Sequence, residues 1–100
     1  MNSRVRSFLR AQAHDLRPIV MVGKGGVNES VVAALNEALD HHELVKIKFQ
    51  DFKDEVRALS DELAKATSSE VVAMIGFTAV LFRQDAKNPD RLVKIPNSLL

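Results

Sequence analysis

The segment that decides the fold runs from residue 19 to residue 28 and reads Ile-Val-Met-Val-Gly-Lys-Gly-Gly-Val-Asn. Its first four residues are apolar on both faces, which is typical of a buried strand in the centre of a sheet. The glycine-rich stretch after them cannot continue as regular structure, and Asn28 is a residue type that caps helix N-termini. The segment therefore predicts a strand, a tight loop and a helix in direct succession.

Periodicity predicts the elements on either side of this segment. Apolar residues at helical spacing indicate helices over 3–16, from Val27 or Asn28 to about residue 41, and over 55–67, the last capped by Asp54 or a neighbour. Residues 44–49 alternate as a strand, with Lys46 and Lys48 on the outer face. Two further β-rich runs, 71–75 and 78–82, flank Gly76-Phe77, which is the pattern of a type II′ hairpin.

These elements give the order α-β-α-β-α-β-β. The step around the glycine loop requires a parallel crossover, and the closing hairpin is antiparallel, so the sheet should be mixed. We expect a single α/β domain with a mixed four-stranded sheet packed with three helices. From Gln84 onward we expect an irregular tail, docked by Leu92, Val93 and Ile95.

Composition narrows the function classes. The chain has 100 residues, 46% hydrophobic and 27% charged, which suits one globular domain. It has no cysteine, so disulfides, thiol nucleophiles and cysteine-type zinc sites are excluded. No apolar run is long enough to cross a bilayer, and we expect a cytoplasmic protein. We expect neither a cofactor nor a metal: His41 and His42 are adjacent and cannot chelate one ion from a helix, and His42 falls on the inner stripe of its helix.

Positive charge is concentrated at the front of the chain. Residues 1–24 hold five basic residues and one acid, a net charge of +4, whereas the remaining residues have a net charge of −3. Arg6 and Arg10 lie close together beside the apolar stripe of the first helix. They could widen a positive surface that begins at Lys24.

The glycine loop is the strongest candidate for a binding site. A strand-to-helix junction collects unpaired N–H groups and the positive end of the helix dipole, and glycines let a phosphate approach the backbone. The P-loop spacing is absent, and a dinucleotide fingerprint fails because Asn28 stands where its third glycine belongs. A nucleic-acid backbone fits better, since the G-x-x-G loop of KH-type modules clamps a single strand in this way.

The same residues resemble the CRM domain, named for chloroplast RNA splicing and ribosome maturation. The resemblance rests on Val22–Gly26, on the stretch Ala38–Ile47, on Leu9-Arg10-x-x-Ala13-His14-x-Leu16-x-Pro18 and on Val80–Arg83. It covers about residues 4–96, and we expect a CRM-type domain over 1–96 with a C-terminal tail over 97–100. Small stand-alone bacterial members, the YhbY type, have this length.

The resemblance implies an RNA-binding protein that contacts ribosomal RNA in precursors of the large ribosomal subunit. It implies RNA contacts at the loop Gly23, Lys24, Gly25 and Gly26, to which we add Asn28, Arg6 and Arg10. We expect a monomer without enzymatic activity. Two alternatives stay open: a protein-interaction module without RNA binding, and a protein that binds a small phosphorylated ligand at the same loop.

One position departs from the family. Members usually carry a basic or polar residue after the Ile-Gly pair, where this chain has Phe77. We interpret Phe77 as a partly buried turn residue, in preference to a ring on which a base stacks.

Overall fold

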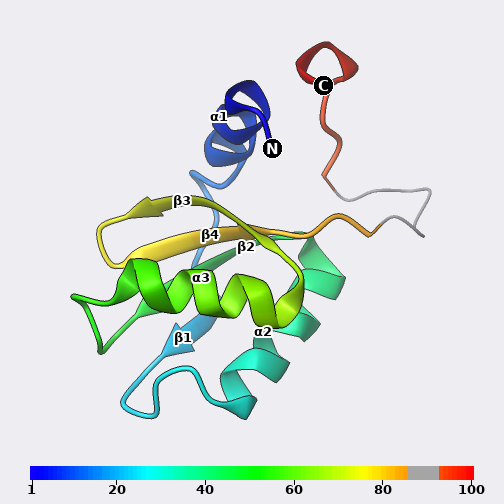
Figure 1. Ribbon diagram of the computed structural model, residues 1–100. Coiled ribbons are helices and arrows are strands. Elements are labelled where there is room, and N and C mark those ends of the chain that lie inside the picture. Colours follow the sequence, from blue (N-terminus) through cyan, green and yellow to red (C-terminus); the bar gives the residue numbers. More distant parts are fainter. Residues whose placement is uncertain (86–92) are drawn as a thin grey trace.

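The computed structural model describes residues 1–85 and 93–100, and its elements follow the predicted order (Figure 1). They are α1 (Ser3–Gln12), β1 (Val20–Val22), α2 (Glu29–His42), β2 (Leu44–Phe49), α3 (Val56–Thr67), β3 (Glu70–Ile75), β4 (Thr78–Phe82) and a 3₁₀ helix, η1 (Asn97–Leu99). The single α/β domain with three helices is confirmed. Leu92, which we expected to dock the tail, lies outside the described residues.

The sheet is mixed and four-stranded, as predicted. Its strand order is β1-β2-β4-β3, with β1 and β2 parallel and the other two pairs antiparallel. Helix α2 connects the two parallel strands. Gly76 has a φ of 59° and Phe77 is not among the positive-φ residues, which fits the predicted type II′ turn between β3 and β4.

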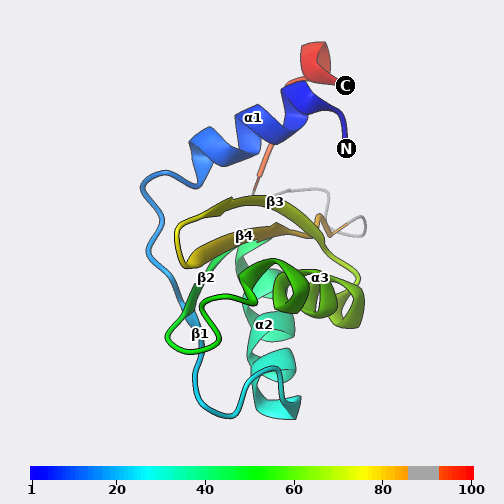
Figure 2. The same ribbon diagram turned by 60° about the vertical axis from the view of Figure 1, so that its left-hand side comes forward.

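The helices divide unequally between the two faces of the sheet (Figures 1 and 2). Helices α2 and α3 cover one face and build the larger core with residues of all four strands, among them the fully buried Ile47, Phe49 and Leu63. On the other face α1 packs Val5 and Leu9 against β3 and β4 in a smaller cluster. Val93 and Ile95 join that smaller cluster, so these two residues dock the C-terminal segment as predicted.

Strand β1 differs from the prediction. We expected a central strand buried on both faces, but β1 is an edge strand and Met21 is 42% exposed. Met21 is exposed because α1 covers β3 and β4 and leaves the β1 side of its face open (Figure 2). Only Val20 and Val22, which point toward α2 and α3, are buried.

Helix boundaries follow local hydrogen bonds. Helix α2 begins after Asn28, whose Oδ1 accepts from the Val31 N–H at 2.9 Å, so the predicted cap is confirmed. Helix α3 follows Glu55, which makes no side-chain capping bond. Helix α1 ends at Gln12 rather than near residue 16, because the chain passes into a turn in which the His14 N–H donates to the Ala11 oxygen. His42 is exposed rather than on an inner stripe.

Two charged side chains hydrogen-bond to backbone groups of distant segments. The Arg6 guanidinium donates to the carbonyl oxygens of Val71 and Val72, at 2.7 and 3.1 Å, where β3 is bulged. Glu43 is 1% exposed, and its carboxylate accepts from the N–H groups of Asp85 and Val93, at 2.7 and 2.9 Å. Both residues tie together segments that are far apart in sequence.

Candidate functional site

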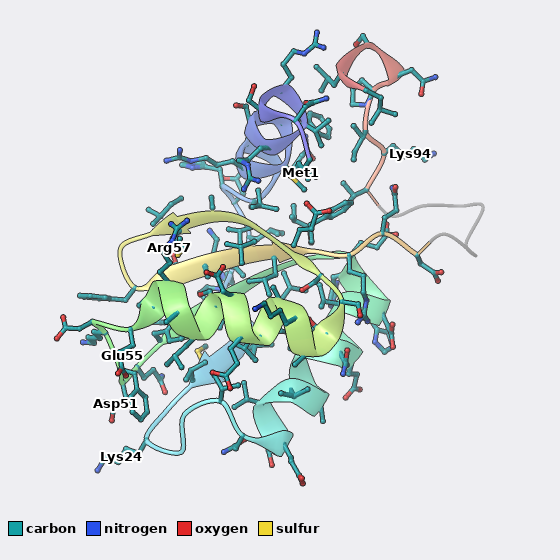
Figure 3. All side chains as sticks on the ribbon, in the orientation of Figure 1. Met1, Lys24, Asp51, Glu55, Arg57 and Lys94 are labelled. Carbon is teal, nitrogen blue, oxygen red and sulfur yellow. The ribbon has the colours of Figure 1, made fainter. Side chains whose placement is uncertain are left out.

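Three loops meet at one end of the sheet. They are the 23–28 loop after β1, the 50–55 loop after β2, and the hairpin turn between β3 and β4. The Gln50 N–H donates to the Val22 oxygen at 2.9 Å, and the Phe49 N–H donates to the Phe77 oxygen at 2.8 Å. Figure 3 shows Lys24 and Asp51 at this end. The end therefore presents three loops side by side.

The 23–28 loop is a compact turn. The Gly26 N–H donates to the Gly23 oxygen at 3.0 Å, and the Asn28 N–H donates to the Gly26 oxygen at 3.1 Å. Gly26 has a φ of 66°, in the left-handed region that glycine adopts without strain. The loop then enters α2 through the Asn28 cap.

Several backbone N–H groups of this loop have no partner. Among the described residues, none accepts a hydrogen bond from the N–H groups of Lys24, Gly25, Val27, Glu29 or Ser30. Two of these belong to the first turn of α2, where the helix dipole adds positive potential. Unpaired N–H groups in this arrangement can donate hydrogen bonds to an anion without breaking any bond of the fold.

The three glycines of the loop differ in what requires them. A Cβ on Gly25 would lie 2.7 Å from the Asn28 side-chain nitrogen, and Gly26 needs its positive φ and lies against the Phe52 ring. Gly23 has open space where a Cβ would lie, and its φ is outside the left-handed region. The fold therefore explains Gly25 and Gly26 but not Gly23.

Charges around the loop are mixed. Lys24 is exposed, and in Figure 3 its side chain extends outward from the end of the molecule. The neighbouring 50–55 loop contributes acids, and one of them, Asp51, accepts from the Phe52 N–H at 2.7 Å. Glu29 adds an exposed acid in the first turn of α2. Lys24 is thus the one basic residue of the 23–28 loop, and acids lie on the segments next to it.

Phe77 lies at the same end of the sheet. It is 49% exposed, and the Lys53 ammonium lies 4.9 Å from the centre of its ring. Such a contact is a cation–π interaction.

The sequence analysis did not predict that the 50–55 loop belongs to this site, although one signal was available. Parallel neighbours β1 and β2 must end at the same edge of the sheet, so the residues after each strand adjoin.

The structure brings together Gly23, Lys24, Gly25, Gly26 and Asn28, but it does not bring Arg6 and Arg10 to them. Both arginines are on α1, which lies on the opposite side of the sheet from the loop in both views (Figures 1 and 2). Both arginines are exposed, and Arg6 in addition donates hydrogen bonds to β3. Any contact that these arginines make with a ligand is separate from that of the loop.

Metal sites and membrane-spanning helices find no support in the described residues. Residues 1–85 and 93–100 contain no group of three or more histidines or acids that could hold a metal ion. The helices in the same part of the chain are too short or too polar to cross a membrane.

Comparison with known proteins shows a consistent set of relatives. The family model of the CRS1/YhbY (CRM) domain matches residues 1–83. A Bacillus subtilis protein named "Probable RNA-binding protein YqeI" is 36% identical over 88% of this chain and 93% of its own length. A Haemophilus influenzae "RNA-binding protein" is 36% identical over 83% of this chain and 85% of its own length.

The fold has a solved counterpart. The solution structure of SAV1595 from Staphylococcus aureus superposes with a TM-score of 0.79 at 32% identity. The match covers 96% of this chain and 99% of that one.

Proposed function

The chain belongs to the CRS1/YhbY (CRM) domain family, and on that basis we propose that it binds RNA by gripping the phosphate backbone with the Gly23–Asn28 loop. The observation that carries the proposal is the set of unpartnered N–H groups around Lys24, at the N-terminus of α2. The names of the relatives support RNA as the anion. No step of this function is catalytic.

The loop can hold a phosphate with its existing geometry. Phosphate oxygens accept hydrogen bonds from the free N–H groups of the loop and of the first turn of α2, while Lys24 supplies a mobile positive charge. The absence of a Cβ at Gly23 leaves room for the sugar-phosphate chain to reach the backbone. In this arrangement Gly23 is required by the ligand and not by the fold.

The acids beside the loop limit the footprint. Glu29 and Asp51 repel phosphates, so the RNA chain must pass the loop on the side of Lys24. We therefore expect roughly 3–5 phosphate contacts, each lowering the logarithm of the affinity by about 0.7 per decade of salt on a single strand. Binding to short RNA should be weak, and it should strengthen on a folded particle that offers several contacts.

The family resemblance also suggests a biological ligand. We propose that the RNA is ribosomal and that the protein associates with precursors of the large ribosomal subunit in the cytoplasm, as a monomer. Arg6 and Arg10 remain predicted RNA contacts. Because they lie apart from the loop, they would engage a different segment of the same RNA.

Charge reversal at the loop tests the proposal. We expect Lys24→Glu to weaken binding of a labelled single-stranded RNA by tenfold or more, measured by fluorescence anisotropy, because it replaces an attraction by a repulsion. Lys65 is an exposed lysine on α3, so Lys65→Glu is the matched control and should change RNA affinity far less. Equal effects of the two substitutions would show that the loop is not the binding site.

Gly23→Ala tests the approach of the backbone. The methyl group meets open space in the free protein, so the melting temperature should be unchanged. RNA affinity should fall several-fold, because the methyl group occupies the path of the phosphate. A variant that keeps both stability and affinity would show that RNA does not require a glycine at this position.

Two measurements address the rival functions and the ribosomal assignment. If the loop binds a phosphorylated small molecule, mononucleotides should raise the melting temperature saturably. If the loop is a clamp for the RNA backbone, they should raise the melting temperature little.

Crosslinking in cells, followed by sequencing of the attached RNA, should recover ribosomal RNA of the large subunit. Recovery of mainly messenger RNA would contradict the ribosomal assignment and leave the clamp intact.

A further inference from the structure

Part of the sheet remains uncovered on the α1 side. One row of side chains crosses all four strands at the loop end, because Met21, Lys48, Thr78 and Ile75 are successive register partners. On β1, Met21 is 42% exposed, and Ile19, which lies two residues before Met21 on the same face, is 52% exposed. Exposed apolar side chains gathered on one face mark an interaction surface.

This surface is continuous with the 23–28 loop along β1. Met21 lies two residues before Gly23, and Ile19 lies two residues before Met21. At the rise of an extended strand, Gly23 and Ile19 are roughly 13 Å apart. A short run of nucleotides that starts at the loop can therefore reach the far end of β1.

A pocket lies at that far end, between the linker after α1, the start of β2 and the end of α2. Its volume is about 340 Å³, and Leu16 and Ile19 are among its apolar walls. Polar groups at the pocket come from Gln12, Arg17, His42 and Lys46, and none of the described lining residues is acidic. Apolar walls with a few polar groups are the usual form of a site for a small flat ligand.

We call the surface that runs from Gly23 along β1 to this pocket the track. Its chemistry favours RNA bases over a peptide or a lipid. Lys48 lies beside Met21, and Arg17 and Lys46 lie at the pocket, so basic residues accompany the apolar ones over the whole track. Phosphates can follow the lysines while bases lie on the aliphatic side chains, which accept the faces of heterocycles as apolar pockets do. The track has no acid that would repel a phosphate among its described residues.

We propose that the uncovered face of β1 and β2 carries bases of the RNA segment whose phosphates the loop holds, and that the pocket beside Ile19 accepts one unpaired base. This inference rests on the proposed function, and it narrows the ligand to single-stranded RNA whose unpaired bases contact the protein. The loop binds the phosphate backbone of the RNA. The base contacts along the track make the protein prefer RNA to a polyanion without bases.

The test compares two labelled oligonucleotides of equal length on the full chain: single-stranded RNA and the same ribose-phosphate chain without bases. Wild-type protein should bind the intact RNA about tenfold more tightly, which is within the contribution of one or two base contacts. Ile19→Ser and, separately, Gln12→Ala should reduce this preference to about threefold or less. Neither should change affinity for the base-free chain.

Ile75→Ser is the matched control, because Ile75 is an equally exposed isoleucine of the opposite edge strand. It should keep the full preference, and melting temperatures of all variants should confirm that they are folded. Equal losses in Ile19→Ser and Ile75→Ser, or a preference that both pocket variants retain, would overturn the proposal. A preference abolished by Phe77→Ala alone would overturn it in favour of stacking at the hairpin turn.

The failures of the two proposals are distinguishable. If wild-type protein binds both oligonucleotides equally and Lys24→Glu weakens both, the clamp stands and the base track is wrong. If wild-type protein binds neither oligonucleotide, the clamp and the track are both wrong.

Discussion

The two faces of the sheet contrast in how completely they are covered. Two helices close one face, and every strand contributes side chains to the core beneath them. A single helix of ten residues covers part of the other face, and exposed apolar residues remain on β1 and at the end of β3. Stability therefore resides mainly in the closed face, while the open face and its adjoining loop are free to serve binding.

The largest expected effect is on the closed face. Phe49→Ala removes a fully buried ring, and we expect a loss of about 3–5 kcal/mol in the free energy of unfolding. Chemical denaturation followed by circular dichroism measures it. A loss below about 1 kcal/mol would mean that this core is not the main source of stability.

The next effect is beneath α1. Leu9→Ala leaves a cavity in the smaller cluster, and we expect a loss of about 2–3 kcal/mol, because a small cluster near the surface relaxes more easily than the larger core. Hydrogen exchange should show faster opening of α1 than of α2. Uniform acceleration in both helices would indicate that the two faces unfold as one unit.

A pair of neighbours on β1 compares the faces within one strand. Val22 is fully buried toward α2 and α3, whereas Met21 points to the open face. We expect Val22→Ala to cost about 2 kcal/mol and Met21→Ala about 0.5 kcal/mol or less. Thermal melts of the two variants measure the two losses of stability, and equal losses would contradict the exposure of Met21.

The smallest expected effect separates the two arginines of α1. Arg6→Ala removes two hydrogen bonds to β3 and should cost about 1 kcal/mol, whereas Arg10→Ala should leave stability unchanged. RNA affinities of the same two variants separate a structural role from a binding role. A loss of RNA affinity in Arg10→Ala at unchanged stability would place a second contact on α1.

Much of the fold could be predicted because its signals are local. Alternation in residues 44–49, the glycine of the hairpin turn and the asparagine cap of α2 each report on a few neighbouring residues. The loop at the strand-to-helix junction follows from the same local pattern. The element order then follows from joining these segments.

The rest depended on contacts between distant segments. The exposure of Met21 on β1 reflects where α1 docks, and the periodicity of α1 alone does not specify that position. The pairing of Arg6 with the β3 bulge required knowledge of the sheet register. For the same reason, the sequence suggested a positive surface running from Lys24 to Arg10, although the fold puts the two residues on opposite sides of the sheet.

The buried carboxylate of Glu43 has a practical consequence. It fixes the backbone at Asp85 and at Val93, the two residues that flank the segment 86–92. A substitution of Glu43 should therefore act at two places at once, because one carboxylate holds both a residue beyond β4 and the start of the C-terminal segment.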